Sequence, residues 1–108
     1  MEIFKQLKKL GYKHYIDLTI EELDALPIDN IEKRIECSLV IDWLREIHQL
    51  HIEIQSPDYP FEDLFTWTIH KVKKFGSYGD GSSEDYYKAR EQAILKAIEL
   101  CQNNSTHT

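Results

Sequence analysis

Histidine is the most versatile chemical side chain in this sequence, because it can bind metals and transfer protons near neutral pH. The chain of 108 residues has five histidines: His14, His48, His51, His70 and His107. His48 and His51 stand three residues apart, a spacing that zinc sites use. A zinc site also needs a third and a fourth ligand, and no cysteine or carboxylate motif at ligand spacing accompanies this pair. We therefore expect no metal site and no cofactor.

Nucleophilic catalysis would need a serine or cysteine beside a histidine and an orienting acid. The sequence contains neither a nucleophile elbow nor a Cys-x-x-Cys motif. Cys37 and Cys101 fall within helical patterns, so we expect two buried thiols. Adjacent acids occur at helix starts and in loops, where solvated carboxylates are common: Glu21/Glu22, Glu62/Asp63 and Glu84/Asp85. We predict that the chain is not an enzyme. A small hydrolase or metal-dependent enzyme stays an alternative, because residues distant in sequence can meet in a fold.

The glycine-rich run GSYGDGSS at residues 76–83 is the nearest approach to a phosphate-binding loop. No Gly-Lys-Ser/Thr follows it, and the next helix opens with Glu84 and Asp85, which would repel a phosphate. The run is instead predicted to be a flexible turn, with Ser82 as the N-cap of the last helix.

Two groups of residues are candidates for binding a macromolecule. The candidate interaction surface is one face of a predicted strand, with Thr66, Thr68 and His70, together with Tyr59 and Tyr78 nearby. The alternative is a basic, nucleic-acid-binding patch of Lys71, Lys73, Lys74, Lys88 and Arg90. Nucleic-acid binding is disfavoured, because 13 Lys+Arg against 19 Asp+Glu give a net charge of −6. An unknown protein is the expected partner.

Composition and length limit the class of protein that carries these residues. Hydrophobic residues make up 42% and charged residues 30%, with 4 Gly and 3 Pro, which is typical of a globular domain. The length suits one small domain, predicted over residues 1–104 with a frayed tail at 105–108. No apolar stretch is long enough to cross a membrane, and the first residues do not resemble an export signal, so we expect a cytoplasmic protein.

Apolar residues at helical spacing predict helices over residues 2–10, 18–27 and 29–50, and a last helix that begins after Ser82 and includes Cys101. In the second helix, Thr19 and Glu22 are spaced as a capping box. Asp29 is expected to cap the third helix. The core face of that third helix is predicted to contain Leu39, Val40, Trp43, Leu44, Ile47 and Leu50, extended by Ile31 and Ile35.

Alternating polar and apolar residues predict strands over residues 51–56 and 64–72, joined by an acidic, proline-containing loop. A third, weakly signalled strand would lie around residues 74–78. The order of elements indicates an α+β fold, with a small antiparallel sheet of two to three strands and helices packed on one face. Ile41 and Leu95 are apolar but lie off the predicted core faces, which leaves a homodimer open.

The stretch GDGSSEDYYKAREQAILKAIEL is similar to the closing segment of double-stranded-RNA-binding domains. Ala89, Ala93 and Ala97 match the packing alanines of that family. The resemblance implies a shared topology of helix, three strands and helix. It does not imply RNA binding, because Glu84 and Asp85 stand where the family's helix has its phosphate-gripping lysines.

A second resemblance covers about residues 40–101, in the segments VIDWLREIHQLHIEI, FTWTIHKV and SSEDYYKAREQAILKAIEL. These look like small uncharacterised proteins of bacteriophages, prophages and mobile elements. The resemblance implies a fold and brings no activity or catalytic residue with it. We therefore expect a non-enzymatic accessory or protein-interaction domain of phage or mobile-element origin, with a nucleic-acid-binding module as the alternative.

Overall fold

The computed structural model describes residues 2–58, 60, 63–74 and 76–105. This part of the chain forms four helices and a three-stranded antiparallel sheet, which confirms the predicted α+β fold. The elements are α1 Ile3–Lys9, α2 Ile20–Ala25, α3 Ile31–His48, β1 Leu50–Gln55, β2 Phe65–Lys71, β3 Gly79–Ser83 and α4 Tyr86–Ser105. The tail predicted at residues 105–108 lies outside the described residues, apart from Ser105, which belongs to α4.

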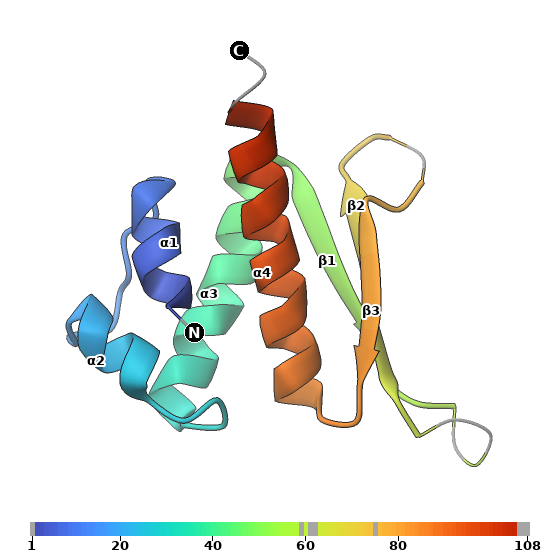
Figure 1. The fold of residues 1–108 in the computed structure, drawn as a ribbon, viewed down its shortest axis with the longest axis horizontal. Coiled ribbons are helices and arrows are strands. Elements are labelled where there is room, and N and C mark those ends of the chain that lie inside the picture. Colours follow the sequence, from blue (N-terminus) through green and yellow to red (C-terminus); the bar gives the residue numbers. More distant parts are fainter. Residues whose placement is uncertain (1, 59, 61–62, 75, 106–108) are drawn as a thin grey trace.

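The helices cover one face of the sheet, and the other face is free of them (Figure 1). Strand order is β1-β2-β3, and α4 packs against all three strands while α3 packs against β1 and α4. α1 contacts α2 and α4, so the N-terminal pair lies beyond the helical layer as seen from the sheet. The core lies between the sheet and the helices, where Leu50, Ile52, Trp67 and Ile69 are each at most 6% exposed.

The third strand forms, but it lies at Gly79–Ser83 and not around residues 74–78. Its sequence, GDGSS, has little intrinsic preference for a strand, which is why we expected a turn there. A contact distant in sequence explains the difference. The indole of Trp67 lies so close to Gly81 that a Cβ at that position would be 2.6 Å from the ring. Glycine therefore lets β3 pair with β2 underneath the tryptophan.

Helix caps follow the sequence in part. The capping box of Thr19 and Glu22 is confirmed, with both hydrogen bonds present. The cap of α3 is Asn30, not Asp29, because a turn in which Asn30 N–H donates to the carbonyl of Pro27 places the first helical residue at Ile31. The cap of α4 is Asp85, not Ser82, because Ser82 belongs to β3. The Asp85 carboxylate accepts from Lys88 N–H at 3.0 Å.

The predicted core face of α3 is correct at Val40 and Leu44, which are fully buried, and wrong at Ile31, Ile35 and Ile47, which are 66%, 54% and 62% exposed. Leu50 is buried as expected, but it belongs to β1 and not to the helix. For Ile31 and Ile35, helix geometry gives the reason. Ile35 precedes Leu44 by nine residues, which at about 100° per residue is half a turn of the helix away, so Ile31 and Ile35 lie on the opposite side of α3 from the core.

Two buried contacts hold the N-terminal segment against α3. The Glu36 carboxylate is fully buried and accepts hydrogen bonds from the Tyr12 hydroxyl and from the backbone N–H groups of Tyr15 and Ile16. The Lys33 ammonium, on a side chain that is 5% exposed, donates to the carbonyl of Leu26 at 3.0 Å. Each of these two charged side chains has a hydrogen-bond partner where it is buried, and the Glu36 carboxylate has three.

At its other end, α3 passes into β1 through a single residue. Gln49 adopts the left-handed conformation, with φ 59°, and its N–H donates to Leu44 O. Its carbonyl accepts from Val72 N–H at 2.9 Å, which extends the pairing of β1 with β2 by one bond. α3 and β1 are therefore joined without a loop.

Candidate functional site

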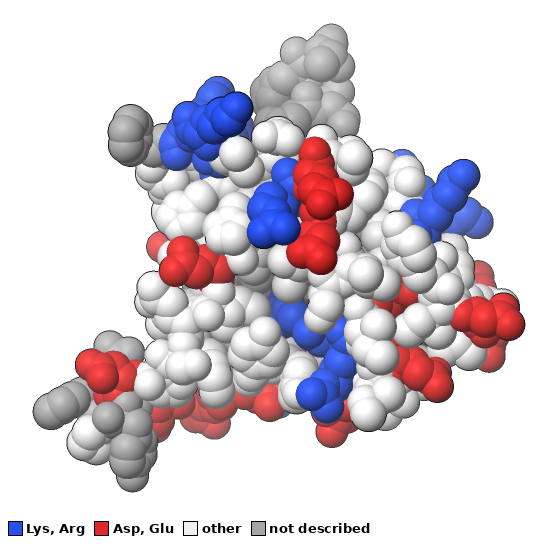
Figure 2. Space-filling model, turned by 180° about the vertical axis from the view of Figure 1, so that it is seen from behind, with Lys and Arg blue, Asp and Glu red and all other residues white. Residues whose placement is uncertain are grey.

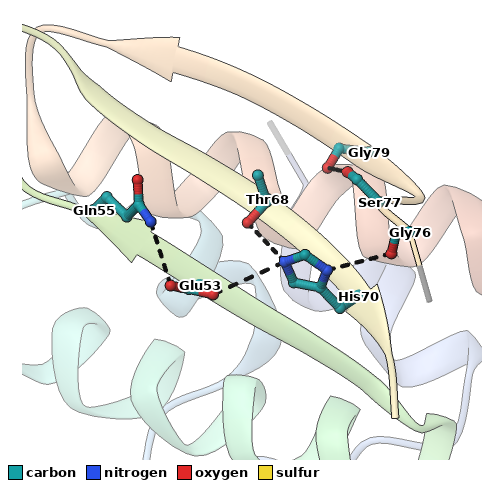
Figure 3. Close-up of polar contacts among 7 residues, drawn as sticks. All are labelled: Glu53, Gln55, Thr68, His70, Gly76, Ser77 and Gly79. Atoms are coloured by element: carbon teal, nitrogen blue, oxygen red, sulfur yellow. Dashed lines mark hydrogen bonds and ion pairs between the residues drawn. The ribbon is translucent and has the colours of Figure 1, made fainter. Parts of the chain in front are cut away.

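The outer face of the sheet carries the strand part of the predicted interaction surface. Thr66, Thr68 and His70 point away from the helices, and the register places Gln55, Glu53 and His51 directly opposite them on β1. Figure 3 shows Glu53, Gln55, Thr68 and His70 on this face, with the helices behind the sheet. The surface is polar along both strands.

His70 is the centre of a small hydrogen-bond network on this face (Figure 3). Its Nδ1 lies 3.3 Å from the carbonyl of Gly76, and its Nε2 lies 3.1 Å from the hydroxyl of Thr68 and 3.8 Å from the Glu53 carboxylate. Because a carbonyl only accepts, Nδ1 carries the hydrogen, and in the neutral ring Nε2 accepts from the Thr68 hydroxyl. A hydroxyl beside an oriented imidazole is an arrangement that nucleophilic enzymes use. Here both His70 and Glu53 are open to water, with side chains 38% and 47% exposed, which favours a solvated polar network.

The two tyrosines of that prediction are not both described by the structure. Tyr59 lies outside the described residues. Tyr78 precedes β3, and its ring lies 4.5 Å from the Lys71 ammonium in a cation–π contact. The structure therefore brings Thr68 and His70 together and places Tyr78 beside a lysine of the alternative patch.

The basic residues of that alternative patch lie at two ends of the molecule. Lys71, Lys73 and Lys74 come at and after the end of β2, whereas Lys88 lies in the first turn of α4, beside the opposite end of the sheet. Arg90 is 5% exposed. Figure 2 shows Lys and Arg side chains in separate groups on one face of the molecule, with Asp and Glu among them.

A hollow of about 320 Å³ lies between the first turns of α3 and α4. We call it the α3–α4 groove; its lining residues are Ile31, Arg34, Ile35, Ser38, Tyr86, Tyr87 and Arg90. Tyr86 is 39% exposed, and with Ile31 and Ile35 it gives the groove three exposed, largely apolar side chains. Exposed apolar side chains gathered at a hollow are typical of a binding surface.

Aromatic rings hold the two arginines of the groove. The Arg34 guanidinium lies 4.6 Å from the centroid of the Tyr87 ring, and that of Arg90 lies 5.4 Å from the same centroid. The Arg90 guanidinium is also 5.9 Å from the Tyr86 centroid, and Phe65 packs edge-on against Tyr86 at 5.8 Å. Such contacts fix the planes of the guanidinium groups.

The sequence interpretation assigned the groove residues to other roles. Ile31 and Ile35 were expected in the core, and Arg90 in a basic surface patch. The spacing of Ile31, Ile35 and Ser38 is itself helical and marks a second face of α3. The contact of Arg34 with Tyr87 depends on how α3 and α4 cross, which no local pattern reveals.

Comparison with known proteins gives no information on the function of this groove. No protein-family model, curated protein or solved structure matches the chain. Among the residues that the structure describes, no three His, Cys, Asp or Glu side chains gather as metal ligands would. No helix in the described part of the chain is long and apolar enough to cross a membrane.

Proposed function

We propose that this chain is a non-enzymatic protein-interaction domain, and that its α3–α4 groove binds a segment of a partner protein. The exposure of Ile31 and Ile35, at 66% and 54%, is the observation that carries the proposal. These side chains stand one helical turn apart beside the groove, together with Tyr86. Covering an apolar side chain of this size contributes about 1.5–3 kcal/mol, so a partner that covers all three gains substantial affinity.

The chemistry of the groove supports binding more than catalysis. Ser38 is its one aliphatic hydroxyl among the lining residues, and that hydroxyl donates to the carbonyl of Arg34 at 3.1 Å. The lining residues include no histidine or carboxylate to act as a base. A phage or mobile-element origin, implied by resemblance alone, stays a prediction.

The test compares three tagged proteins in capture experiments from a lysate of the source cells. They are the unchanged chain, the groove variant Ile31→Glu/Ile35→Glu, and the control Ile47→Glu. Ile47 is also on α3 and is 62% exposed, but it lies in the last turn, away from the groove. We expect a partner that the unchanged chain and the control retain and the groove variant loses. Equal capture by all three proteins would refute the proposal.

Self-association is a separate outcome, because a second copy could also cover the groove. Sedimentation velocity of the same three proteins distinguishes it. We expect all three to sediment as monomers. A dimer that only the groove variant loses would mean that the groove joins two copies of this chain, and the proposed hetero-partner would then be wrong.

The nucleic-acid alternative rests on the order of α3, β1, β2, β3 and α4, with both helices on one face, which agrees with the topology that the resemblance implies. The positions of the basic residues give the nucleic-acid alternative less support, because Arg90 is buried and Lys88 lies far from Lys71. Filter binding to duplex RNA at low salt tests it. Salt-dependent binding that Lys73→Ala/Lys74→Ala weakens would favour this alternative.

A further inference from the structure

Three charged side chains are buried among the described residues, and they differ in how well they are satisfied. The Glu36 carboxylate accepts three hydrogen bonds, and the Lys33 ammonium donates to a backbone carbonyl. Within the part of the chain that the structure describes, Arg90 makes one side-chain hydrogen bond, from Nη1 to the Ser38 hydroxyl, and at 3.4 Å it is long. A guanidinium has five N–H donors, so most of the donors of Arg90 have no acceptor among the described residues.

The surroundings of Arg90 hold its guanidinium in place without neutralising it. The Tyr86 and Tyr87 rings lie within 5.9 Å of the guanidinium carbon, and the side chain borders the α3–α4 groove. Within the described part of the chain, no carboxylate forms an ion pair with Arg90 or with Arg34. A buried charge held by packing and lacking an acidic partner is costly unless a ligand completes it.

We propose that the groove recognises a carboxylate on the partner, with Arg90 and Arg34 donating to it while apolar side chains next to it cover Ile31, Ile35 and Tyr86. This inference rests on the proposed function and names the chemistry of the partner: a peptide segment in which an acidic group is flanked by apolar residues. Carboxylates accept paired N–H donors from arginine in a planar geometry. A singly charged carboxylate suits the site better than a doubly charged phosphate, because Glu84 and Asp85 lie where α4 begins.

The test uses a small probe with the same two features, hydrocinnamate, and its uncharged analogue hydrocinnamamide. Each is titrated into isotope-labelled protein, and backbone amide shifts are followed by NMR. We expect millimolar binding of hydrocinnamate, which is ordinary for a ligand of this size, with shifts confined to the first turns of α3 and α4. The amide should bind about tenfold more weakly, because it lacks the charge-assisted hydrogen bonds.

Three variants test whether the two arginines cause the preference for hydrocinnamate over the amide. Arg90→Lys keeps the charge but loses the paired donors, and Arg34→Gln removes the charge of the half-buried arginine in case the Arg90 variant does not fold. Arg45→Gln is the control, because Arg45 is also on α3 but pairs with Asp42 at 3.5 Å on the exposed surface. We expect both groove variants to reduce the preference for the acid, and the control to keep it.

The possible failures separate this inference from the proposed function. Equal binding of acid and amide in the groove would overturn the carboxylate inference and leave the apolar binding site standing. Tighter binding of phenyl phosphate than of hydrocinnamate would also overturn it. Shifts that spread over the surface, or no binding of any probe, would count against the groove as a site at all.

Discussion

The Tyr12 hydroxyl donates a hydrogen bond to the carboxylate of Glu36, a residue 24 positions further along the chain, and neither side chain is more than 5% exposed. The same carboxylate accepts from two backbone N–H groups of the segment that links α1 to α2. Burial and the neighbouring carboxylate together raise the pKa of Tyr12, so the phenol stays protonated and keeps donating.

Removing this donor should destabilise the protein. Tyr12→Phe leaves one buried oxygen of Glu36 without its partner, and we expect the free energy of unfolding to fall by about 1–3 kcal/mol. Urea denaturation measures it. Tyr15→Phe is the matched control, because the Tyr15 side chain is 76% exposed and only its backbone contacts Glu36. Equal stability of the two variants would show that the Tyr12 hydroxyl contributes nothing.

A methyl group at Gly81 should disturb the sheet. In Gly81→Ala the Cβ would lie 2.6 Å from the indole of Trp67, so the ring or β3 has to move, and we expect a loss of about 1–3 kcal/mol. The indole also donates to Gln92 on α4 at 3.0 Å, so its displacement should change the tryptophan fluorescence. The comparison variant is Gly79→Ala, in which the Cβ would lie 2.8 Å from Cγ of Lys96. A lysine side chain can change rotamer more easily than a buried indole can move, so we expect a smaller loss of stability there. A Gly81→Ala protein as stable as Gly79→Ala would contradict the close approach.

Stability should depend on pH through His48. Burial lowers the pKa of His48 from its ordinary value of 6.5, and its Nε2 is buried with no hydrogen-bond partner among the residues that the structure describes. As the pH falls below 6.5, the unfolded state takes up the proton before the folded state does. The stabilisation is therefore complete above that pH and declines below it, until the folded protein is protonated too.

The variant His48→Phe keeps a ring against Trp43, which lies 4.7 Å away between centroids, and removes the titration. We expect its urea midpoint to vary less with pH than that of the unchanged protein over the acid side of 6.5. The control His51→Phe changes a ring on the outer face of the sheet. If His48→Phe and the unchanged protein have the same pH dependence, then another group accounts for it.

The two cysteines should react slowly in the folded protein. Burial raises the pKa of both thiols, and for Cys37 the nearby Arg90 opposes this effect only in part. The side chains of Cys37 and Cys101 are 7% and 4% exposed. We expect a chromogenic disulfide reagent to label both much more slowly in buffer than in urea. Rapid labelling of the folded protein would mean that α3 or α4 opens readily.

Local chemistry made much of the fold predictable. The capping box of Thr19 and Glu22 and the alternation around Trp67 depend on residues close in sequence, and both are confirmed. Gly11, with φ 99°, follows the end of α1 in the left-handed conformation that glycine favours. Likewise Thr68 and His70 are neighbours on one strand face, and their contact follows from that spacing.

Contacts between distant elements were beyond the sequence pattern. β3 pairs with β2 where Trp67 lies close against Gly81, and a run of glycine and serine gives no sign of that contact. The groove needs Arg34 from α3 and Tyr87 from α4, whose meeting is set by the crossing of the two helices. Arg90 looks like any surface arginine in the sequence, and only packing shows that it is buried.

The junction at Gln49 joins α3 and β1 into one continuous run of regular structure. Because a single residue separates α3 from β1, a rotation of the helix is transmitted directly to the strand. The groove lies at one end of the 18-residue helix and the sheet begins at the other, about 27 Å away. A partner that tilted α3 by about 5° would shift its far end by about 2 Å. A partner bound in the groove would thereby shift the positions of His51 and Glu53, on a surface that the partner does not contact.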